Sequence, residues 1–346
     1  MANQHNVIFE AARLHFEQGL KQDDVARRLR VSRPTVARYL AMARDMGFVA
    51  VRVLDPKSHA YLHDLEIHLL ERYPHLREAI LTASRPEIVE CGASAARRAV
   101  ADELAERAAG RLDFLLSSRR RQADPVVAVA RGEMVDNVLR HLRPTMPLPQ
   151  LEVLPMLGYL RSREYPYDAN RLAQELARIY AGHYEWIPAP AVVSSQHAQI
   201  LREVPLIAGP LARLEQSVNV ILTSLSCPYQ TDADGERQLR EQTLLQSGMV
   251  DPAQIVELVD RTGAVGEICG WYYTNEEVVT VPGVELLGLS PQRQRDLAAT
   301  PDCSVIGVAG ADPDRLPAIR AAADLGLINV LLTDYVTAHA LLQTES

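Results

Sequence analysis

The sequence is nearly devoid of lysine: Lys21 and Lys57 are the only two among 36 basic residues, and the other 34 are arginines. Because no lysine follows position 57, the large C-terminal part of the chain cannot form a Schiff base with a carbonyl substrate. Cysteines are also few, and none has CxxC spacing, so neither a zinc ribbon nor a disulfide framework is indicated. We expect buried, apolar cysteines instead. They lie at positions 91, 227, 269 and 303.

Long apolar runs are absent as well. None reaches the length of a membrane span, and residues 1–19 have the pattern of an amphipathic helix rather than a secretory leader. Metal-ligand spacing is equally scarce, since His59 and His63 form an HxxxH pair without further ligands. The sequence therefore predicts a cytoplasmic protein without a membrane partner, a metal site or a cofactor.

Negative charge dominates overall, but it is unevenly distributed. The net charge is −8. Residues 1–57 contain ten Lys/Arg and six Asp/Glu, which gives +4, so residues 58–346 carry −12. A basic head on an acidic body indicates that only the N-terminal part contacts nucleic acid.

A candidate DNA-binding motif spans residues 22–40, QDDVARRLRVSRPTVARYL. Its apolar residues have the spacing of two short helices packed across a tight turn. Ser32 stands where the second helix begins, and its hydroxyl can accept a hydrogen bond from a backbone N–H of the first turn. Arg30 occupies the turn position where glycine is commonest, which predicts a strained or altered turn. The predicted inward-facing residues are Val25, Ala26, Leu29, Val36, Leu40 and Ala43.

The segments on either side complete the predicted DNA-binding domain. Residues 6–18 have the pattern of a first helix that covers the motif. Gly47 is a natural helix stop, and the β-branched residues 48–53 predict a short strand. The first helix would face inward through Val7, Ile8, Ala11, Leu14 and Phe16.

The outward face of the second helix combines arginines with small side chains. This combination suits the major groove, where Arg reads guanine edges and hydroxyl groups contact phosphates. A helical hairpin with a solvated basic face is the alternative. Because one such motif covers only a few base pairs, we expect a homodimer or homotetramer on double-stranded operator DNA. The residues predicted to contact DNA are Lys21, Gln22, Ser32, Arg33, Pro34, Thr35, Ala37, Arg38 and Ala41.

The rest of the chain predicts an α/β fold. Short β-rich runs alternate with helical runs, which is typical of a mostly parallel sheet wrapped by helices. VVAVA and VIGVAG are apolar on both faces, as buried parallel strands are. The predicted strands are 79–81, 126–130, 151–157, 184–187, 218–223, 284–289, 304–309 and 327–333. The predicted helices are 93–117, 134–142, 168–181, 196–203, 237–246, 252–261, 291–298, 315–325 and 335–343.

Loops that follow the strands are the candidate ligand site, because parallel sheets bind ligands beyond the carboxyl ends of their strands. Arg131, Gly132 and Glu133 follow VVAVA. Gly158 follows LEVLPML, and the loop after VIGVAG leads to Arg315. A glycine at such a turn lets backbone N–H groups converge on an anion, although it is often purely structural.

A further loop is dense in glycine around a single carboxylate. It is GAVGEICG, residues 263–270, with Glu267 at its centre. Such a carboxylate either holds sugar hydroxyls or satisfies local backbone N–H groups.

Taken together, these segments resemble the SorC family of bacterial transcriptional regulators, the sorbitol-operon and deoxyribonucleoside-regulator type. In the large domain the resemblance rests on IPAPAVV (187–193), GAVGEICGWYY (263–273), VIGVAG (305–310) and AIRAAADLGLINVLLTD (318–334). It implies a helix-turn-helix domain at 1–56, a linker helix at 57–77 and, at 78–346, an effector-binding and oligomerisation domain. That domain would have a fold like that of sugar-phosphate isomerases and deaminases, and would bind a sugar or sugar phosphate that alters operator binding.

The resemblance also implies site residues, with departures from the family pattern. Glu267 matches an acidic position of the family and Asn170 a helix-start asparagine. The first phosphate loop keeps Gly132, but Glu133 and Met134 stand where a hydroxyl residue is usual, and Arg315 replaces a lysine. The predicted effector-binding residues are Arg131, Gly132, Glu133, Met134, Gly158, Asn170, Glu267, Gly310 and Arg315.

Alternatives remain for the large domain. A carboxylate in an anion site is unfavourable for phosphate, so a non-phosphorylated or non-sugar effector is one of them. A ligand-free oligomerisation domain is another. A sugar-phosphate isomerase-type enzyme is the remote one, because Glu133 and Glu267 are the only nominated acid/base groups and neither has an identifiable partner. We predict no catalytic residues.

Overall fold

The computed structural model consists of two compact units, Met1–His59 and Ala60–Ser346. The helix predicted at 57–77 is α4 (Pro56–Arg72), whose Leu65 and Leu69 belong to the hydrophobic core of the second unit. None of the described helices is long and apolar enough to span a lipid bilayer. The structure describes residues 2–17, 19–45, 56–83, 93–119, 124–160, 167–232, 235–240 and 243–343.

The first unit is a helix-turn-helix domain. α1 (Ala2–Ala12) continues into a π-helical turn, η1 (Arg13–Glu17), and is followed by α2 (Gln22–Leu29) and α3 (Arg33–Asp45). All three helices contribute to one small core, and its α2 and α3 members have the predicted inward spacing. Its buried residues are Ile8, Ala11, Ala12, Leu14, Val25, Ala26, Val36, Leu40 and Ala43.

Phe16 was predicted to face the core of this unit, and that prediction is wrong. Phe16 is 39% exposed, because it lies in the π-helical turn, where the 3.6-residue periodicity used to place it no longer holds. The helix stop predicted at Gly47 and the strand predicted at 48–53 lie outside the described residues. Cys91 of the second unit, which was predicted to be buried, also lies outside them.

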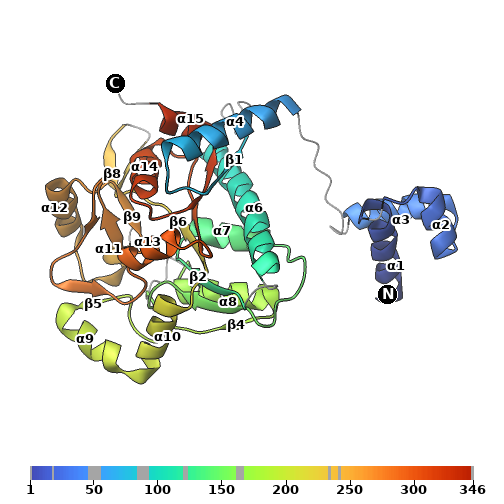
Figure 1. Ribbon diagram of the computed structural model, residues 1–346. Helices are drawn as coiled ribbons and strands as arrows, with labels where there is room; N and C mark the ends of the chain where they lie inside the picture. Colours follow the sequence, from blue (N-terminus) through green and yellow to red (C-terminus); the bar gives the residue numbers. More distant parts are fainter. Residues whose placement is uncertain are drawn as a thin grey trace. The chain divides into compact units, whose positions relative to one another are not determined.

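The second unit is built on a parallel sheet of seven strands, as the alternation of strands and helices predicted. From edge to edge, the order is β1, β14, β13, β6, β2, β3 and β4. Figure 1 labels β1, β6, β2 and β4 of this sheet. Successive strands run outward from β2 to β4 on one side and from β6 to β14 on the other, so the winding reverses between β2 and β6. The strands are β1 (Glu78–Thr82), β2 (Val126–Val129), β3 (Glu152–Pro155), β4 (His183–Tyr184), β6 (Val220–Ser224), β13 (Ser304–Val308) and β14 (Val330–Asp334).

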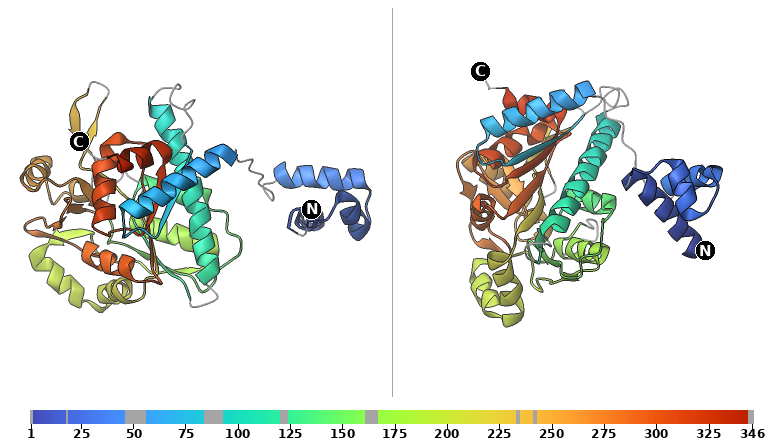
Figure 2. Two further views of the ribbon diagram at one scale, coloured as in Figure 1. Left: turned by 45° about the horizontal axis from the view of Figure 1, so that its top comes forward. Right: turned by 45° about the vertical axis from the view of Figure 1, so that its right-hand side comes forward.

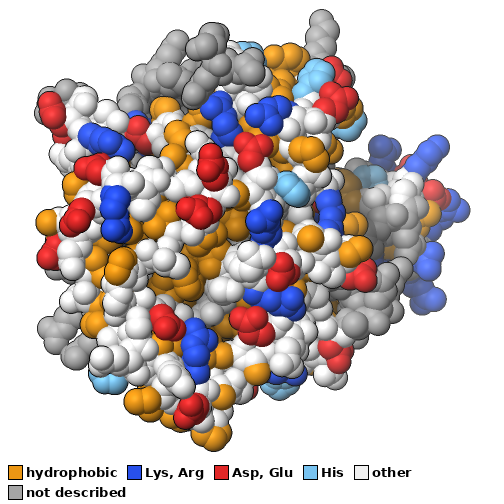
Figure 3. Space-filling model, turned by 60° about the vertical axis from the view of Figure 1, so that its left-hand side comes forward, with side chains coloured by type: hydrophobic (Ala, Val, Ile, Leu, Met, Phe, Trp, Pro, Cys, Tyr) orange, Lys and Arg blue, Asp and Glu red, His pale blue; other side chains and the backbone are white. Residues whose placement is uncertain are grey.

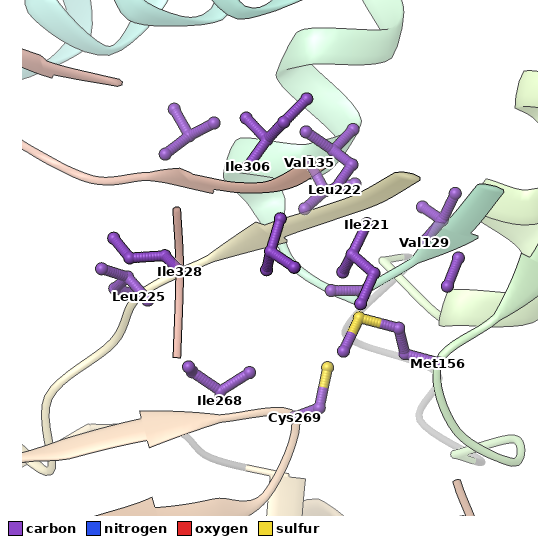
Figure 4. Packing of buried hydrophobic residues seen from close by; sticks show 14 of the residues in the cluster. Val129, Val135, Met156, Ile221, Leu222, Leu225, Ile268, Cys269, Ile306 and Ile328 are labelled. Atoms are coloured by element: carbon purple, nitrogen blue, oxygen red, sulfur yellow. The ribbon is translucent and has the colours of Figure 1, made fainter. Parts of the chain in front are cut away.

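Side chains alternate between the two faces of this sheet. Leu222 of β6 pairs with Ile306 of β13, and Figure 4 shows both on the same face as Val135 of α7. Ile221, one residue earlier, points to the opposite face, toward Met156 and Cys269. Both faces are therefore buried, which explains why these strands are apolar throughout.

Helices and smaller sheets cover the two faces (Figure 2). α6 (Ala93–Arg119), α7 (Glu133–His141) and α8 (Ala169–Tyr180) pack on one face. The other face is covered by α13 (Pro291–Ala299) and by a three-stranded antiparallel sheet, on which α14 packs. That sheet consists of β9 (Gly266–Ile268), β10 (Trp271–Tyr273) and β11 (Val278–Val279).

The remaining elements depart from the predictions in several places. Residues 237–246 are not one helix: β8 (Arg237–Leu239) pairs with β7 (Tyr229–Thr231), and α11 (Thr243–Ser247) follows. β12 (Val284–Leu286) pairs with β5 (Val192–Ser194) outside the main sheet. The other helices are α9 (Ser195–Glu203), α10 (Pro205–Gln216), α12 (Pro252–Thr262), η2 (Pro313–Arg315), α14 (Leu316–Asp324) and α15 (Tyr335–Leu342).

Candidate functional site

The turn between α2 and α3 sets the angle at which α3 is presented. Arg30 has left-handed backbone angles (φ 55°, ψ 42°), so the structure adopts the strained conformation that the absence of glycine predicted. The Val31 N–H donates to the Ala26 carbonyl over 3.0 Å, and the Arg30 N–H donates to the Arg27 carbonyl. This pair of bonds is the Schellman ending of a helix. The Ser32 hydroxyl then accepts the Thr35 N–H at 3.3 Å and caps α3.

The predicted DNA-contacting residues form the exposed side of this motif. Arg33, Ala37, Arg38 and Ala41 of α3 are all exposed, as is Lys21 before α2. The spacing of Ala37, Arg38 and Ala41 places them away from Val36, Leu40 and Ala43, which are buried in the core. Arg33 is exposed as the first residue of α3. Of the remaining predicted residues, Ser32 and Pro34 are exposed, and Gln22 and Thr35 are half-buried.

A second candidate site lies where the winding of the sheet reverses. The loops after β2, β6 and β13 meet there at the carboxyl ends of the strands, the usual ligand position in doubly wound sheets. They enclose a cavity of about 430 Å³, which is the size of a small-metabolite site. Its sequence-predicted lining residues are Arg131, Gly132, Glu133, Met134, Glu267, Gly310 and Arg315.

Two predicted effector residues do not line this cavity. Gly158 lies where two chain segments cross, and a Cβ atom there would come within 2.3 Å of the Ala189 carbonyl oxygen. The Asn170 Oδ1 atom accepts the Ile187 N–H at 3.0 Å and so joins α8 to the segment after β4. Both residues hold backbone in place.

A buried hydrogen-bond network forms one wall of the cavity. The Arg131 guanidinium donates to the Thr243 hydroxyl over 3.0 Å and to the Gln246 side-chain oxygen. The Thr243 hydroxyl in turn donates to Glu267 Oε1 over 3.0 Å. The Gly270 N–H donates to the same oxygen, at the end of a turn in which Cys269 has a left-handed φ of 50°. Burial raises the pKa of the neighbouring Cys269 thiol to about 12, so it stays protonated.

An ion-pair cluster forms the wall next to β13. Arg240 pairs with Asp312, and Arg315 lies 3.7 Å from the same carboxylate. Burial by itself raises the pKa of Asp312, but the charges of Arg240 and Arg315 and the hydrogen bonds outweigh it and hold that pKa below its ordinary value. Asp312 is therefore ionised at neutral pH and neutralises part of the arginine charge.

Several lining residues escaped the sequence-based prediction. Arg97, Arg98 and Asp102 come from α6, whose residues are weakly segregated into polar and apolar faces, so no periodicity marked the side that faces the cavity. Ser224 is the last residue of β6 and Ser226 lies just after it, and serines at the carboxyl end of a buried strand are a local signal for such a site.

The fold and the two sites define a regulator class: a helix-turn-helix unit joined to a parallel α/β unit with a small-molecule cavity. Residues 61–343 match the family described as "Putative sugar-binding domain". The chain belongs to this family and is a transcriptional regulator of the SorC family.

Individual relatives agree with this assignment. The transcriptional regulator LsrR of Enterobacter sp. (strain 638) is 27% identical over 98% of this chain and 93% of its own. The deoxyribonucleoside regulator of Bacillus subtilis (strain 168) is 23% identical over 96% of each chain. The full-length sorbitol operon regulator SorC from Klebsiella pneumoniae has the same fold, with a TM-score of 0.70 at 20% identity over 98% of both chains.

Proposed function

We propose that this SorC-family regulator binds operator DNA through α3 and binds a small polyhydroxylated metabolite, a sugar or sugar phosphate, in the cavity between β2 and β6. Occupation of the cavity changes operator affinity. The observation that carries the proposal is the presence of both parts in one chain: an exposed, arginine-bearing α3 and a cavity at the reversal point of the sheet.

The α3 surface supports sequence-specific DNA binding. Arg33 and Arg38 are exposed on one side of the helix with the small residues Ala37 and Ala41 beside them, so the backbone can approach base edges closely. Lys21 lies just before α2, where a cation would contact phosphate without reading sequence.

The cavity supports a hydroxyl-rich effector. Polar groups converge there from three strand ends and from α6 and α7, and the cavity volume suits a compact metabolite. Ser224 and Ser226 add hydroxyl groups that both donate and accept. The relatives are named as regulators rather than enzymes, and we assign the cavity a sensing rather than a catalytic role.

We further propose a cytoplasmic homodimer or homotetramer on a pseudo-palindromic operator, since one α3 helix covers only a few base pairs. Figure 3 shows hydrophobic side chains gathered at the centre of one face of the second unit, with charges of both signs around them. Large apolar side chains are also exposed on and between α9 and α10, at Ile200, Val204 and Leu206. Such surfaces are typical of subunit contacts.

The test is a mobility-shift titration of the full chain on its own upstream DNA, repeated across a panel of sugars, polyols and their phosphates. We expect at least one compound to change operator affinity several-fold and to raise the melting temperature, because a ligand that binds only the folded state stabilises it. Operator affinity that no compound alters would refute the sensing role, and absence of DNA binding at low salt would refute both roles.

A further inference from the structure

The cavity contains a carboxylate where a phosphate-binding site would place donors. Glu133 is the first residue of α7, directly after Gly132, and its exposed side chain lines the cavity. Within the part of the chain that the structure describes, its carboxylate has no hydrogen-bond or ion-pair partner. The free N–H groups of a helix start attract an anion, and here the chain supplies one of its own.

A second acceptor in the cavity also lacks a donor. Glu267 is only 6% exposed. The Thr243 hydroxyl and the Gly270 N–H both donate hydrogen bonds to its Oε1 atom. Its Oε2 accepts no hydrogen bond from any described residue. Glu267 lines the cavity, so this oxygen is available to a hydroxyl donor of a bound ligand. The cavity thus contains two carboxylates with acceptor oxygens that no described residue occupies.

Three of the five arginines that line the cavity, by contrast, are already engaged. Arg131 donates to Thr243 and Gln246, and Arg315 lies beside Asp312. Arg140 pairs with Asp136 over 2.7 Å. Across the whole lining, five arginines face five Asp and Glu residues, so the formal charge sums to zero. A phosphate dianion brings only acceptors, so it would meet two carboxylates. Of the five lining arginines, only the exposed Arg97 and Arg98 of α6 have no hydrogen-bond or ion-pair partner among the described residues.

We propose that the ligand of this cavity is a non-phosphorylated sugar or polyol, whose hydroxyl groups donate to Glu133 and Glu267. This inference rests on the effector-binding role proposed above for the cavity. Glu133 places a negative charge beside the start of α7, which disfavours a phosphate there. A neutral polyol supplies the donors that both carboxylates lack and adds no charge to a balanced site.

The first test uses inorganic phosphate as the probe. The melting temperature of the full chain is measured against phosphate concentration, with sodium chloride at matched ionic strength as reference. The variants are Glu133→Thr, which removes the carboxylate and adds a hydroxyl donor, and Glu257→Thr as control, since Glu257 is an exposed glutamate on α12. We expect no saturable shift for the wild type or the control, and a saturable rise of a few degrees for Glu133→Thr.

The second test compares matched pairs, such as sorbitol with sorbitol 6-phosphate and ribose with ribose 5-phosphate. No phosphorylated compound is expected to stabilise the wild type more than its free parent. Saturable stabilisation of the wild type by phosphate, or a preference for a phosphorylated partner, would overturn the proposal. A Glu133→Thr variant as indifferent to phosphate as the wild type would overturn the role of Glu133. Both tests omit DNA, so a failure of the regulatory role shows separately, in the operator titration.

Discussion

The Thr243 hydroxyl donates to Glu267 over 3.0 Å in the buried wall of the cavity, and the same hydroxyl accepts a hydrogen bond from Arg131. One side chain therefore links the guanidinium of Arg131, which follows β2 of the main sheet, to the carboxylate of Glu267, which belongs to β9 of the three-stranded sheet. Because Thr243 is fully buried, water does not replace it in either bond. This link acts together with the Arg131–Gln246 and Gly270–Glu267 hydrogen bonds to orient both charged groups.

The first prediction concerns that link. Thr243→Val removes both hydrogen bonds and leaves the shape nearly unchanged, so the unfolding free energy should fall by about 1–3 kcal/mol. Effector affinity should fall as well, because Arg131 and Glu267 lose their common partner. Thr243→Ser retains the hydroxyl and should recover most of both. Urea denaturation and ligand titration measure the two effects, and equal stability of the valine variant and the wild type would contradict this account.

The second prediction separates base reading from phosphate contact. Arg38→Ala should weaken operator binding by about 1–3 kcal/mol and relax the base preference at one position. Lys21→Ala should weaken binding to all sequences alike and lower the slope of affinity against salt by about one. Arg261→Ala, an exposed arginine of α12, serves as the control and should change neither. Mobility shifts over a salt series and a set of operator variants distinguish these outcomes.

The helix-turn-helix was largely predictable because its signals are local. The spacing of Val25, Ala26, Val36 and Leu40 marks the inner faces, and the Ser32 cap depends on three neighbouring residues. The parallel sheet was predictable for the same reason, because strands buried on both faces are apolar throughout.

The parts that the sequence did not reveal depend on tertiary contacts. β9 and β10 are three residues each and are formed by pairing around the Gly270 turn, for which no local pattern exists. α10 begins at Pro205 and contains Pro210. Because proline inside a segment disfavours a helix, the sequence did not predict one here. Asn170 matches the residue type of the family at this position, yet its side chain accepts a hydrogen bond from the Ile187 N–H and does not line the cavity. Residue type alone does not determine where a side chain points.

The third prediction uses the strained turn of the DNA-binding unit. Arg30 has a left-handed backbone, which costs a residue with a Cβ atom about 1–2 kcal/mol, whereas glycine adopts it freely. Arg30→Gly removes this strain, but glycine also gives the unfolded chain more conformational entropy, which offsets part of the gain. The net stabilisation of the unit should therefore be at most about 1 kcal/mol. Arg30→Val should destabilise it. Hydrogen exchange of the α2 and α3 amides in the full chain measures the stability of this unit alone. Faster exchange in the glycine variant than in the wild type would show that Arg30 is not strained.

The fourth prediction follows from the low pKa of Asp312. A carboxyl whose folded-state pKa lies below its unfolded value stabilises the fold above the unfolded pKa of about 3.9, and that stabilisation is lost as the pH falls through the folded pKa. Asp312→Asn should consequently be less stable than the wild type at pH 7, and the difference should shrink as the pH drops below about 4. Urea midpoints from pH 7 to pH 3 measure it. A difference that grows toward acid pH would mean that burial, rather than Arg240, determines this pKa.

The fifth prediction contrasts two glycines. A Cβ atom on Gly310, at the cavity edge, would lie 2.3 Å from Asp334 Oδ2 and 3.0 Å from Leu104 Cδ1. That Asp334 oxygen accepts the Ala311 N–H and the Thr337 hydroxyl, so Gly310→Ala should displace the cap of α15 and cost about 1–3 kcal/mol. Gly110 lies inside α6 with nothing within 4 Å of its Cβ position, so Gly110→Ala should instead stabilise by about 0.5–1 kcal/mol. Thermal unfolding should show opposite shifts in melting temperature, and shifts of the same sign would mean that the loop after β13 can relax around the added methyl group.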